Sequence, residues 1–219
     1  MSSRMVTVTG TGEAASAPDQ AIVRFAIETR AEDAETARTR NAEASRNAMN
    51  AVRSFDVADD DMQLEALMLQ PRREYNRQTG QTEELGYVAV RRVRVELSNI
   101  DDLPELIARV VNEGANRLEG VDYDLKDRSA VESEALRNAA EKARSKAELL
   151  AFTLGVSLGL VQQIDEQDFS SVQPRPNFRL EAMSMQASDQ GGGEPEAFAA
   201  GRITVEARVQ VTFLLTDGG

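Results

Sequence analysis

The sequence predicts an α+β protein of two lobes, with mainly antiparallel sheets and helices packed on one face. Residues 203–215 alternate apolar and polar side chains, which indicates a strand with one buried and one solvent-facing side. Two similar stretches, 5–17 and 20–30, lie at the opposite terminus. Between the termini, apolar residues recur at helical spacing over three ranges, 33–55, 101–114 and 129–154. Strands and helices therefore mix along the whole chain, as an α+β fold requires.

The two N-terminal stretches predict a hairpin, because Pro18 and Asp19 between them are turn-forming residues. A long strand at the end of a chain usually completes a sheet begun elsewhere, so we expect residues 203–215 to return to this hairpin. Gly10 and Gly12 interrupt its first strand. A phosphate-binding loop would need a further glycine and a Gly-Lys-Ser/Thr ending, so a bulge or a close backbone approach is favoured.

The middle of the chain predicts a second hairpin, from residues 62–75 and 83–97 joined by a polar link. The apolar residues of its second strand change parity midway, which suggests a bulge near Arg91 and Arg92 or burial on both faces. The remaining elements are a strand over 118–126, a capping box from Ser129 to Glu132 that opens the last helix, and a strand over 158–165.

We expect one domain over residues 1–219, made of two lobes. The first comprises about 5–85 plus 200–216, and the second, plait-like lobe comprises about 86–166. Residues 167–199 are rich in Gly, Pro and polar side chains and show little periodicity, so they predict a mobile or functional insert.

Composition excludes several function classes. The chain has no His and no Cys, which removes Ser-His-Asp and Cys-His catalysis, disulfides and the common zinc sites. Its net charge of −12 disfavours nucleic-acid binding, which needs a basic face. We find no membrane span and no apolar export signal, so either the chain is made without a signal or the sequence is a mature form.

A cluster of arginines on the second hairpin is the candidate binding site, as a patch for an anion or an acidic partner: Arg72, Arg73, Arg91, Arg92 and Arg94. The alternative is that these arginines pair across the strands with nearby glutamates, namely Glu74, Glu83, Glu84 and Glu96. We predict no catalytic residue, no metal ligand and no cofactor.

Two acidic runs are the alternative candidates for chemistry. Asp59, Asp60 and Asp61 suggest a divalent cation, but the spacing of a calcium loop and its later Glu are missing. Asp101 and Asp102 precede Leu103-Pro104, where carboxylates favour a helix start. We therefore interpret both runs as turns and caps.

Several motifs in sequence order resemble the SIMPL-domain family of bacterial and archaeal proteins, which includes periplasmic immunogenic and stress-related proteins. The motifs span nearly the whole chain: Val6 to Glu13, Ala17-Pro18-Asp19, Gly86-Tyr87, Gly114-Ala115-Asn116, Ala139 to Ala147, Leu154-Gly155-Val156 and the closing valine-rich strand. The resemblance implies a two-lobed α+β fold, export to the periplasm, homo-oligomers in some members and links to oxidative and other stress. It supplies no catalytic residues, and without an export signal in this sequence a cytoplasmic location stays open.

Three functions remain open. The first is a non-enzymatic, self-assembling envelope or stress protein, which rests on the resemblance, the missing catalytic chemistry and long strands whose edges need covering. The second is a ligand- or peptide-binding module that uses the arginine hairpin or the 167–199 insert. The third is a carboxylate-dependent metal enzyme built on Asp59–Asp61 or Asp101–Asp102, which we rank lowest.

Overall fold

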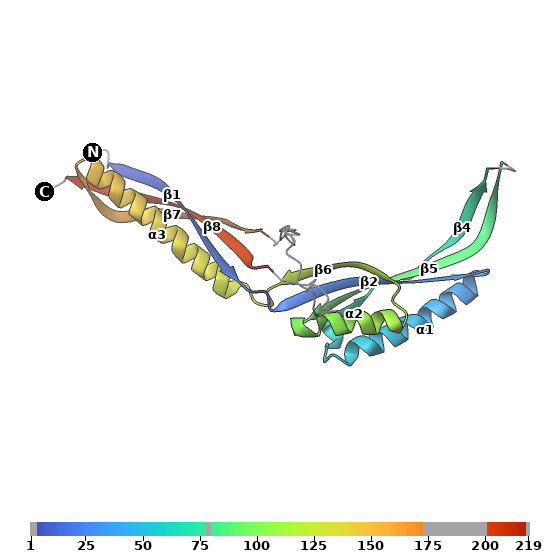
Figure 1. The fold of residues 1–219 in the computed structure, drawn as a ribbon. Helices are drawn as coiled ribbons and strands as arrows, with labels where there is room; N and C mark the ends of the chain where they lie inside the picture. The colour runs from blue at the N-terminus through green and yellow to red at the C-terminus, as the bar shows by residue number, and fades with distance from the viewer. Residues whose placement is uncertain (1–3, 78–79, 173–200, 218–219) are drawn as a thin grey trace, which may run out of the picture. The chain divides into compact units, whose positions relative to one another are not determined.

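The computed structural model describes residues 4–77, 80–172 and 201–217 and confirms an α+β fold with antiparallel sheets (Figure 1). The chain divides into two compact units. Unit 1 comprises Met1–Pro18 and Asp127–Gly219, and unit 2 comprises Asp19–Lys126. These boundaries differ from the expected lobes, 5–85 plus 200–216 and 86–166, because the chain passes from one unit to the other after residue 18 and again after residue 126.

Unit 1 is a three-stranded sheet in the order β1-β8-β7, with the long helix α3 on one face. Its elements are β1 (Met5–Ser16), α3 (Ser129–Thr153), β7 (Val156–Val172) and β8 (Ile203–Asp217). The C-terminal strand does pair with the N-terminal strand, in an unbroken antiparallel register from Met5 opposite Leu214 to Ser16 opposite Ile203. The apolar face of β8, including Val205, is buried, as its period of two predicts.

The predicted N-terminal hairpin is wrong. β1 pairs with β8, whereas β2 (Gln20–Ala31) lies in the sheet of unit 2 and pairs with β5 and β6. The segment Ala17–Asp19 therefore carries the chain from one sheet to another. Its residues suit such a link as well as they suit a hairpin turn, so their composition could not separate the two.

Gly10 and Gly12 allow α3 to lie against β1. A Cβ atom on Gly10 would stand 2.0 Å from the carbonyl oxygen of Ala139, and one on Gly12 would stand 2.2 Å from that of Ala135. The buried stripe of α3 is made almost entirely of alanines, so the backbones of helix and strand come into direct contact. Close backbone approach is thus the confirmed explanation of these glycines, and the register of β1 shows no bulge.

Unit 2 is a five-stranded sheet. Four strands follow the order β3-β5-β2-β6, and the fifth, β4, pairs with the N-terminal part of β5, residues 81–90. Its elements are β2, α1 (Ala34–Arg53), β3 (Met62–Leu64), β4 (Met68–Asn76), β5 (Gln81–Leu97), α2 (Leu103–Asn112) and β6 (Arg117–Asp124), with one-turn 3-10 helices η1 (Asp59–Asp61) and η2 (Ile100–Asp102). The predicted strand over 62–75 is split into β3 and β4. The second hairpin is confirmed, but its irregularity lies between Pro71 and Arg73, not near Arg91.

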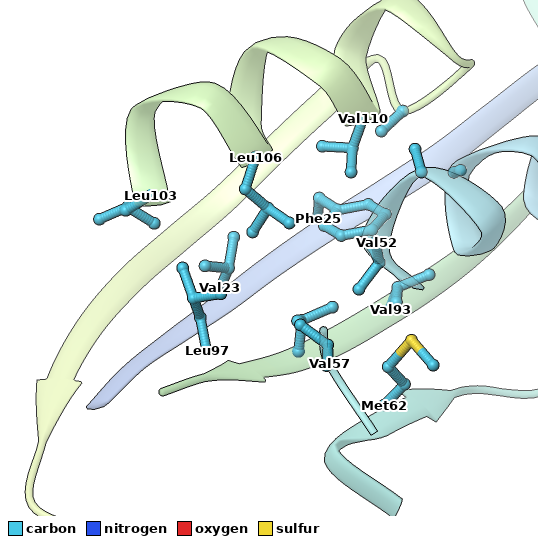
Figure 2. Close-up of a cluster of buried hydrophobic side chains, with 14 of the residues drawn as sticks. Val23, Phe25, Val52, Val57, Met62, Val93, Leu97, Leu103, Leu106 and Val110 are labelled. Atoms are coloured by element: carbon cyan, nitrogen blue, oxygen red, sulfur yellow. The ribbon is translucent and has the colours of Figure 1, made fainter. Parts of the chain in front are cut away.

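The main hydrophobic core lies between the sheet of unit 2 and its helices α1 and α2 (Figure 2). Phe25 of β2 is 1% exposed and sits among Val52 of α1, Leu106 and Val110 of α2. Burying side chains of this size contributes about 1.5–3 kcal/mol each. β2 lies between β5 and β6, so this strand is the centre of the unit.

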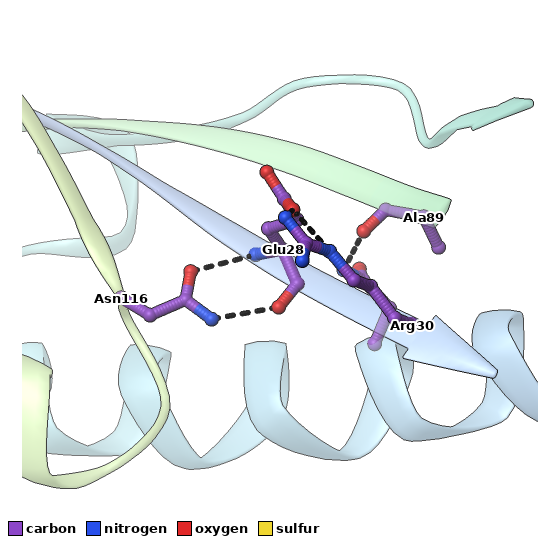
Figure 3. Close-up of polar contacts among 5 residues, drawn as sticks. Glu28, Arg30, Ala89 and Asn116 are labelled. Atoms are coloured by element: carbon purple, nitrogen blue, oxygen red, sulfur yellow. Dashed lines mark hydrogen bonds and ion pairs between the residues drawn. The ribbon is translucent and has the colours of Figure 1, made fainter. Parts of the chain in front are cut away.

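Polar side chains bond to the backbone of β2 beyond the point where its pairing with β6 ends. Asn116 accepts a hydrogen bond from the backbone N–H of Glu28 at 3.0 Å and donates to the carbonyl of Glu28 at 2.7 Å (Figure 3). The Glu28 side chain pairs with Arg30 at 2.6 Å. On the other side, the fully buried Asn41 of α1 donates to the carbonyls of Ile27 and Ala89, which ties the helix to two strands.

Two further expectations need correction. The Ser129–Glu132 capping box does not form: Ser129 is already helical, and Asp127 accepts a hydrogen bond from its N–H at 2.8 Å. The insert expected at 167–199 begins later, because β7 continues to Val172. The rest of that insert, residues 173–199, lies outside the described residues.

Candidate functional site

The predicted arginine patch does not form one surface. β4 carries Arg72 and Arg73, while neighbouring residues of β5 point alternately to opposite faces of the sheet. Ala89, Val93 and Val95 of β5 are buried under α1, so Arg91 shares their face. Arg92 and Arg94 therefore belong to the opposite face.

The arginines on that opposite face are paired. Arg94 forms an ion pair with Glu96, but both residues lie on β5, so this is not the cross-strand pairing that the alternative predicts. Arg92 contacts Glu119 of β6 at 3.1 Å, reaching across the small Ala26 of the central strand, which stands opposite Arg92. Both pairs are partly exposed to solvent, and surface pairs of this kind contribute about 0–1 kcal/mol each.

On β4, Arg73 lies 3.8 Å from Glu84, another of the glutamates named for pairing. Arg72 makes no ion pair within the described ranges. A binding role for these arginines stays a prediction. Among them, Arg91 is the candidate that the structure favours.

Arg91 differs from its neighbours because it lines a pocket beside α1. The pocket has a volume of about 370 Å³, and α1 contributes Ala42, Arg46, Met49 and Arg53 to its wall while β3 contributes Leu64. Ligand sites in proteins commonly measure about 300–1,000 Å³. Sequence reasoning missed Arg46 and Arg53, since no local pattern shows which helix covers this part of the sheet.

The charges in this pocket are unbalanced. Among the described residues, no carboxylate lines it. Arg53 contacts Asp59 at 2.9 Å and donates to Asn50 at 3.2 Å, but neither Arg46 nor Arg91 has an ion pair within the part of the chain that the structure describes. The Nε atom of Arg91 is buried and has no acceptor among those residues. A buried donor without a partner costs roughly 1–3 kcal/mol, so the Nε atom of Arg91 is an unsatisfied donor beside this pocket.

The acidic runs do not converge on a metal site among the described residues. Asp59 is held by Arg53, and the N–H of Asp61 donates to the Ala58 carbonyl, so the run forms a one-turn helix. Asp61 and Asp102 do line one hollow of about 190 Å³, together with Asp56 and Glu96. These are separate carboxylates around a loop, and Asp102 accepts a hydrogen bond from Asn99 at 2.8 Å.

The two edge strands of the unit 1 sheet, β1 and β7, differ in how far other elements cover them. Along β1, α3 covers the edge: Asn138 donates to the carbonyl of Glu13 at 2.9 Å and Lys146 to that of Thr9 at 2.7 Å. At the other edge, no described strand pairs with the outer side of β7.

β7 also exposes apolar side chains. Val161 stands opposite Phe213 and Ile164 opposite Val211, so both point to the face that α3 covers over β8. Phe213 and Val211 are each 5% exposed, whereas Val161 is 49% and Ile164 64% exposed, so these two side chains of β7 are left largely uncovered. Uncovered edge strands of this kind are templates for pairing with another chain.

No helix within the described residues is long and apolar enough to cross a membrane.

Comparison with known proteins identifies the family. The family model described as "SIMPL: Protein of unknown function (DUF541)" matches residues 6–213. The 26 kDa periplasmic immunogenic protein of Brucella melitensis biotype 1 is 29% identical over 213 residues, covering 95% of this chain and 83% of that protein. The uncharacterized protein YggE of Edwardsiella ictaluri is 26% identical over 96% of this chain and 87% of its own, and YggE of Escherichia coli K12 is 27% identical over 96% and 82%. The chain therefore belongs to the SIMPL family.

Proposed function

We propose that the protein is a non-enzymatic component of the cell envelope that assembles with copies of itself through the open edge of β7. The observation that carries the proposal is the contrast between the two edges of the unit 1 sheet. β1 is covered by side chains of α3, whereas no element among the described residues covers the outer backbone groups of β7 or its apolar residues Val161 and Ile164. Soluble proteins usually protect such an edge with charges or with another element.

The charges of β7 favour an antiparallel pair of copies. Asp165 and Glu166 lie toward the C-terminal part of the strand, so a parallel pair in register would set like charges side by side. An antiparallel pair centred near Val161 places them opposite the uncharged Ser157 and Val156 of the other copy. Such a contact uses the same surface on both copies and closes on itself, as two-fold interfaces do.

Export to the periplasm is supported by the name of the Brucella relative, a periplasmic immunogenic protein. The non-enzymatic part of the proposal is supported by a sequence without His or Cys, which removes the commonest general bases and nucleophiles. A role in oxidative or other stress follows from the family resemblance alone and stays a prediction.

Light scattering coupled to size exclusion tests the assembly. We expect the full chain to exceed its monomer mass of 24.0 kDa and to dissociate on dilution. Ile164→Lys should weaken the association at least tenfold, because it adds a charge to the pairing edge. Leu149→Lys is the matched control, since Leu149 on α3 is exposed to the same degree, 65% against 64% for Ile164, but lies away from the edge.

Circular dichroism should show that both variants keep the wild-type fold. A wild-type chain that stays monomeric at every concentration would refute the proposal. Equal effects of Ile164→Lys and Leu149→Lys would refute the assignment of the contact to β7.

The second candidate function is a ligand-binding module. The specific observation in its favour is the pocket in which Arg91 has no partner among the described residues.

A further inference from the structure

Arg91 occupies a position where the sheet of unit 2 otherwise buries apolar residues. Its neighbours on the same face, Ala89 and Val93, are 0% and 1% exposed. Its stem therefore packs under α1, and its Nε atom has no contact with water and no acceptor in the described chain. A buried N–H donor in such a position destabilises the fold unless an acceptor pairs with it.

The face of α1 beside Arg91 supplies further positive charge. Ala42, Arg46, Met49 and Arg53 are spaced by four, three and four residues, so they lie along one side of the helix and line the same pocket. Arg53 is partly neutralised by Asp59, whereas Arg46 is not paired within the described ranges. The pocket is thus cationic on a protein whose net charge is −12. Salt screens the repulsion from distant carboxylates over about 8 Å, so the pocket's own charges dominate at short range.

Apolar atoms complete the wall. Met49 is half-buried on α1, and Leu64 of β3 is 43% exposed and faces the same space. Guanidinium groups bind planar carboxylates through two parallel hydrogen bonds, while a thioether and a Leu side chain favour carbon chains. An inorganic anion would leave this apolar wall unused.

We propose that this pocket binds a small carboxylate that carries an apolar group. The carboxylate lies against Arg91 and Arg46, and the apolar group lies against Met49 and Leu64. A short fatty acid and an N-acylated apolar amino acid share this chemistry. The site lies within unit 2, so it does not depend on assembly through β7, which belongs to unit 1.

Titration calorimetry on the full chain tests the proposal with three probes: octanoate, 1-octanol and inorganic phosphate. We expect octanoate to bind at least tenfold more tightly than either of the others, because only octanoate combines charge and chain. N-acetyl-leucine against octanoate then distinguishes an amino-acid ligand from a fatty acid, and N-acetyl-leucine amide, which lacks the carboxylate, is the control. No octanoate binding at millimolar concentration, or equal binding of octanoate and 1-octanol, would overturn the proposal.

Paired variants separate binding from folding. Arg91→Met should reduce octanoate affinity at least tenfold and raise the melting temperature of the free protein, because it removes a buried N–H donor that has no acceptor. Arg92→Met is the matched control: it is the adjacent residue, lies on the opposite face and pairs with Glu119, so octanoate affinity should not change. A melting temperature lowered by Arg91→Met with unchanged octanoate affinity would show that Arg91 is structural and would refute the site.

Discussion

Gly12→Ala tests whether backbone contact between α3 and β1 holds unit 1 together. The new Cβ would stand 2.2 Å from both the Ala135 oxygen and the Ala139 nitrogen, where backbone cannot give way as a flexible side chain can. An ordinary carbon contact is about 3.5 Å, so the helix would have to retreat by roughly 1 Å. Overpacking of this kind costs about 1–3 kcal/mol. We expect unit 1 to lose stability in that range.

The assay can read the two units separately. All three tyrosines, Tyr75, Tyr87 and Tyr123, lie in unit 2, and the chain has no Trp. Tyrosine fluorescence during urea unfolding therefore follows unit 2, while far-UV circular dichroism also follows α3. With a urea slope of about 1–3 kcal/mol per molar, the unit 1 midpoint should fall by roughly 1 M in Gly12→Ala while the fluorescence midpoint stays in place.

Gly120→Ala is the control, because the nearest atom to its added Cβ is the end of the Arg24 side chain at 3.4 Å. This variant should be neutral or slightly stabilising, since Ala has less backbone freedom than Gly in the unfolded chain. If both variants unfold like the wild type, the backbone contact between helix and strand carries no stability and the reasoning is refuted.

Two further predictions concern α1. Asn41→Leu should lower the free energy of unfolding of unit 2 by about 1–3 kcal/mol, because it removes the hydrogen bonds to Ile27 and Ala89. Tyrosine fluorescence during urea unfolding measures this loss, with Asn47→Leu at an exposed position as the control. Equal urea midpoints for the two variants would contradict the prediction. The N–H of Thr36 lowers the pKa of Asp33, which caps α1. A pKa depressed by folding gives stability that is present above the unfolded value and lost as pH falls through the folded value. Asp33→Asn keeps a hydrogen-bond acceptor at the cap but cannot titrate, so the melting temperature of this variant should fall less than that of the wild type between pH 5 and about pH 3. Parallel curves of melting temperature against pH for the two proteins would contradict the assignment of this pH dependence to Asp33.

Local patterns predicted the elements better than their partners. The period of two in residues 203–215 correctly gave β8 one buried face, and the pairing of β8 with the N-terminal strand is confirmed. β1 and β2 show similar alternation, yet β2 is the central strand of another sheet. A strand pattern reports which faces are buried but not which strand lies alongside, so the hairpin error could not be corrected from the sequence.

The candidate site shows the same limit. Arg91, Arg92 and Arg94 look equivalent as a basic run, but the alternation of a strand separates them: Arg91 shares its face with Val93, and the other two do not. That distinction was within reach of sequence reasoning. The contribution of Arg46 was not, because it depends on how α1 lies across the sheet.

The residues that carry the family resemblance have structural roles and lie outside the two candidate functional surfaces. Gly10 and Gly12 allow α3 to pack closely against β1. Gly86 has φ +95°, and a Cβ atom there would stand 2.3 Å from the carbonyl oxygen of Ala31. Asn116 donates a hydrogen bond to the backbone of β2. None of these residues lines the arginine pocket or the outer side of β7.

A chain can therefore keep this fold while changing what the pocket binds. In a family member that retains the glycines but has an apolar residue in place of Arg91, we expect the same strand order without carboxylate binding. Identities of 26–29% to the relatives leave ample room for such a difference. Carboxylate binding by family members that lack this arginine would contradict the prediction. The ligand would then have to be recognised by residues that all these chains share, and the pocket beside α1 would not be the site.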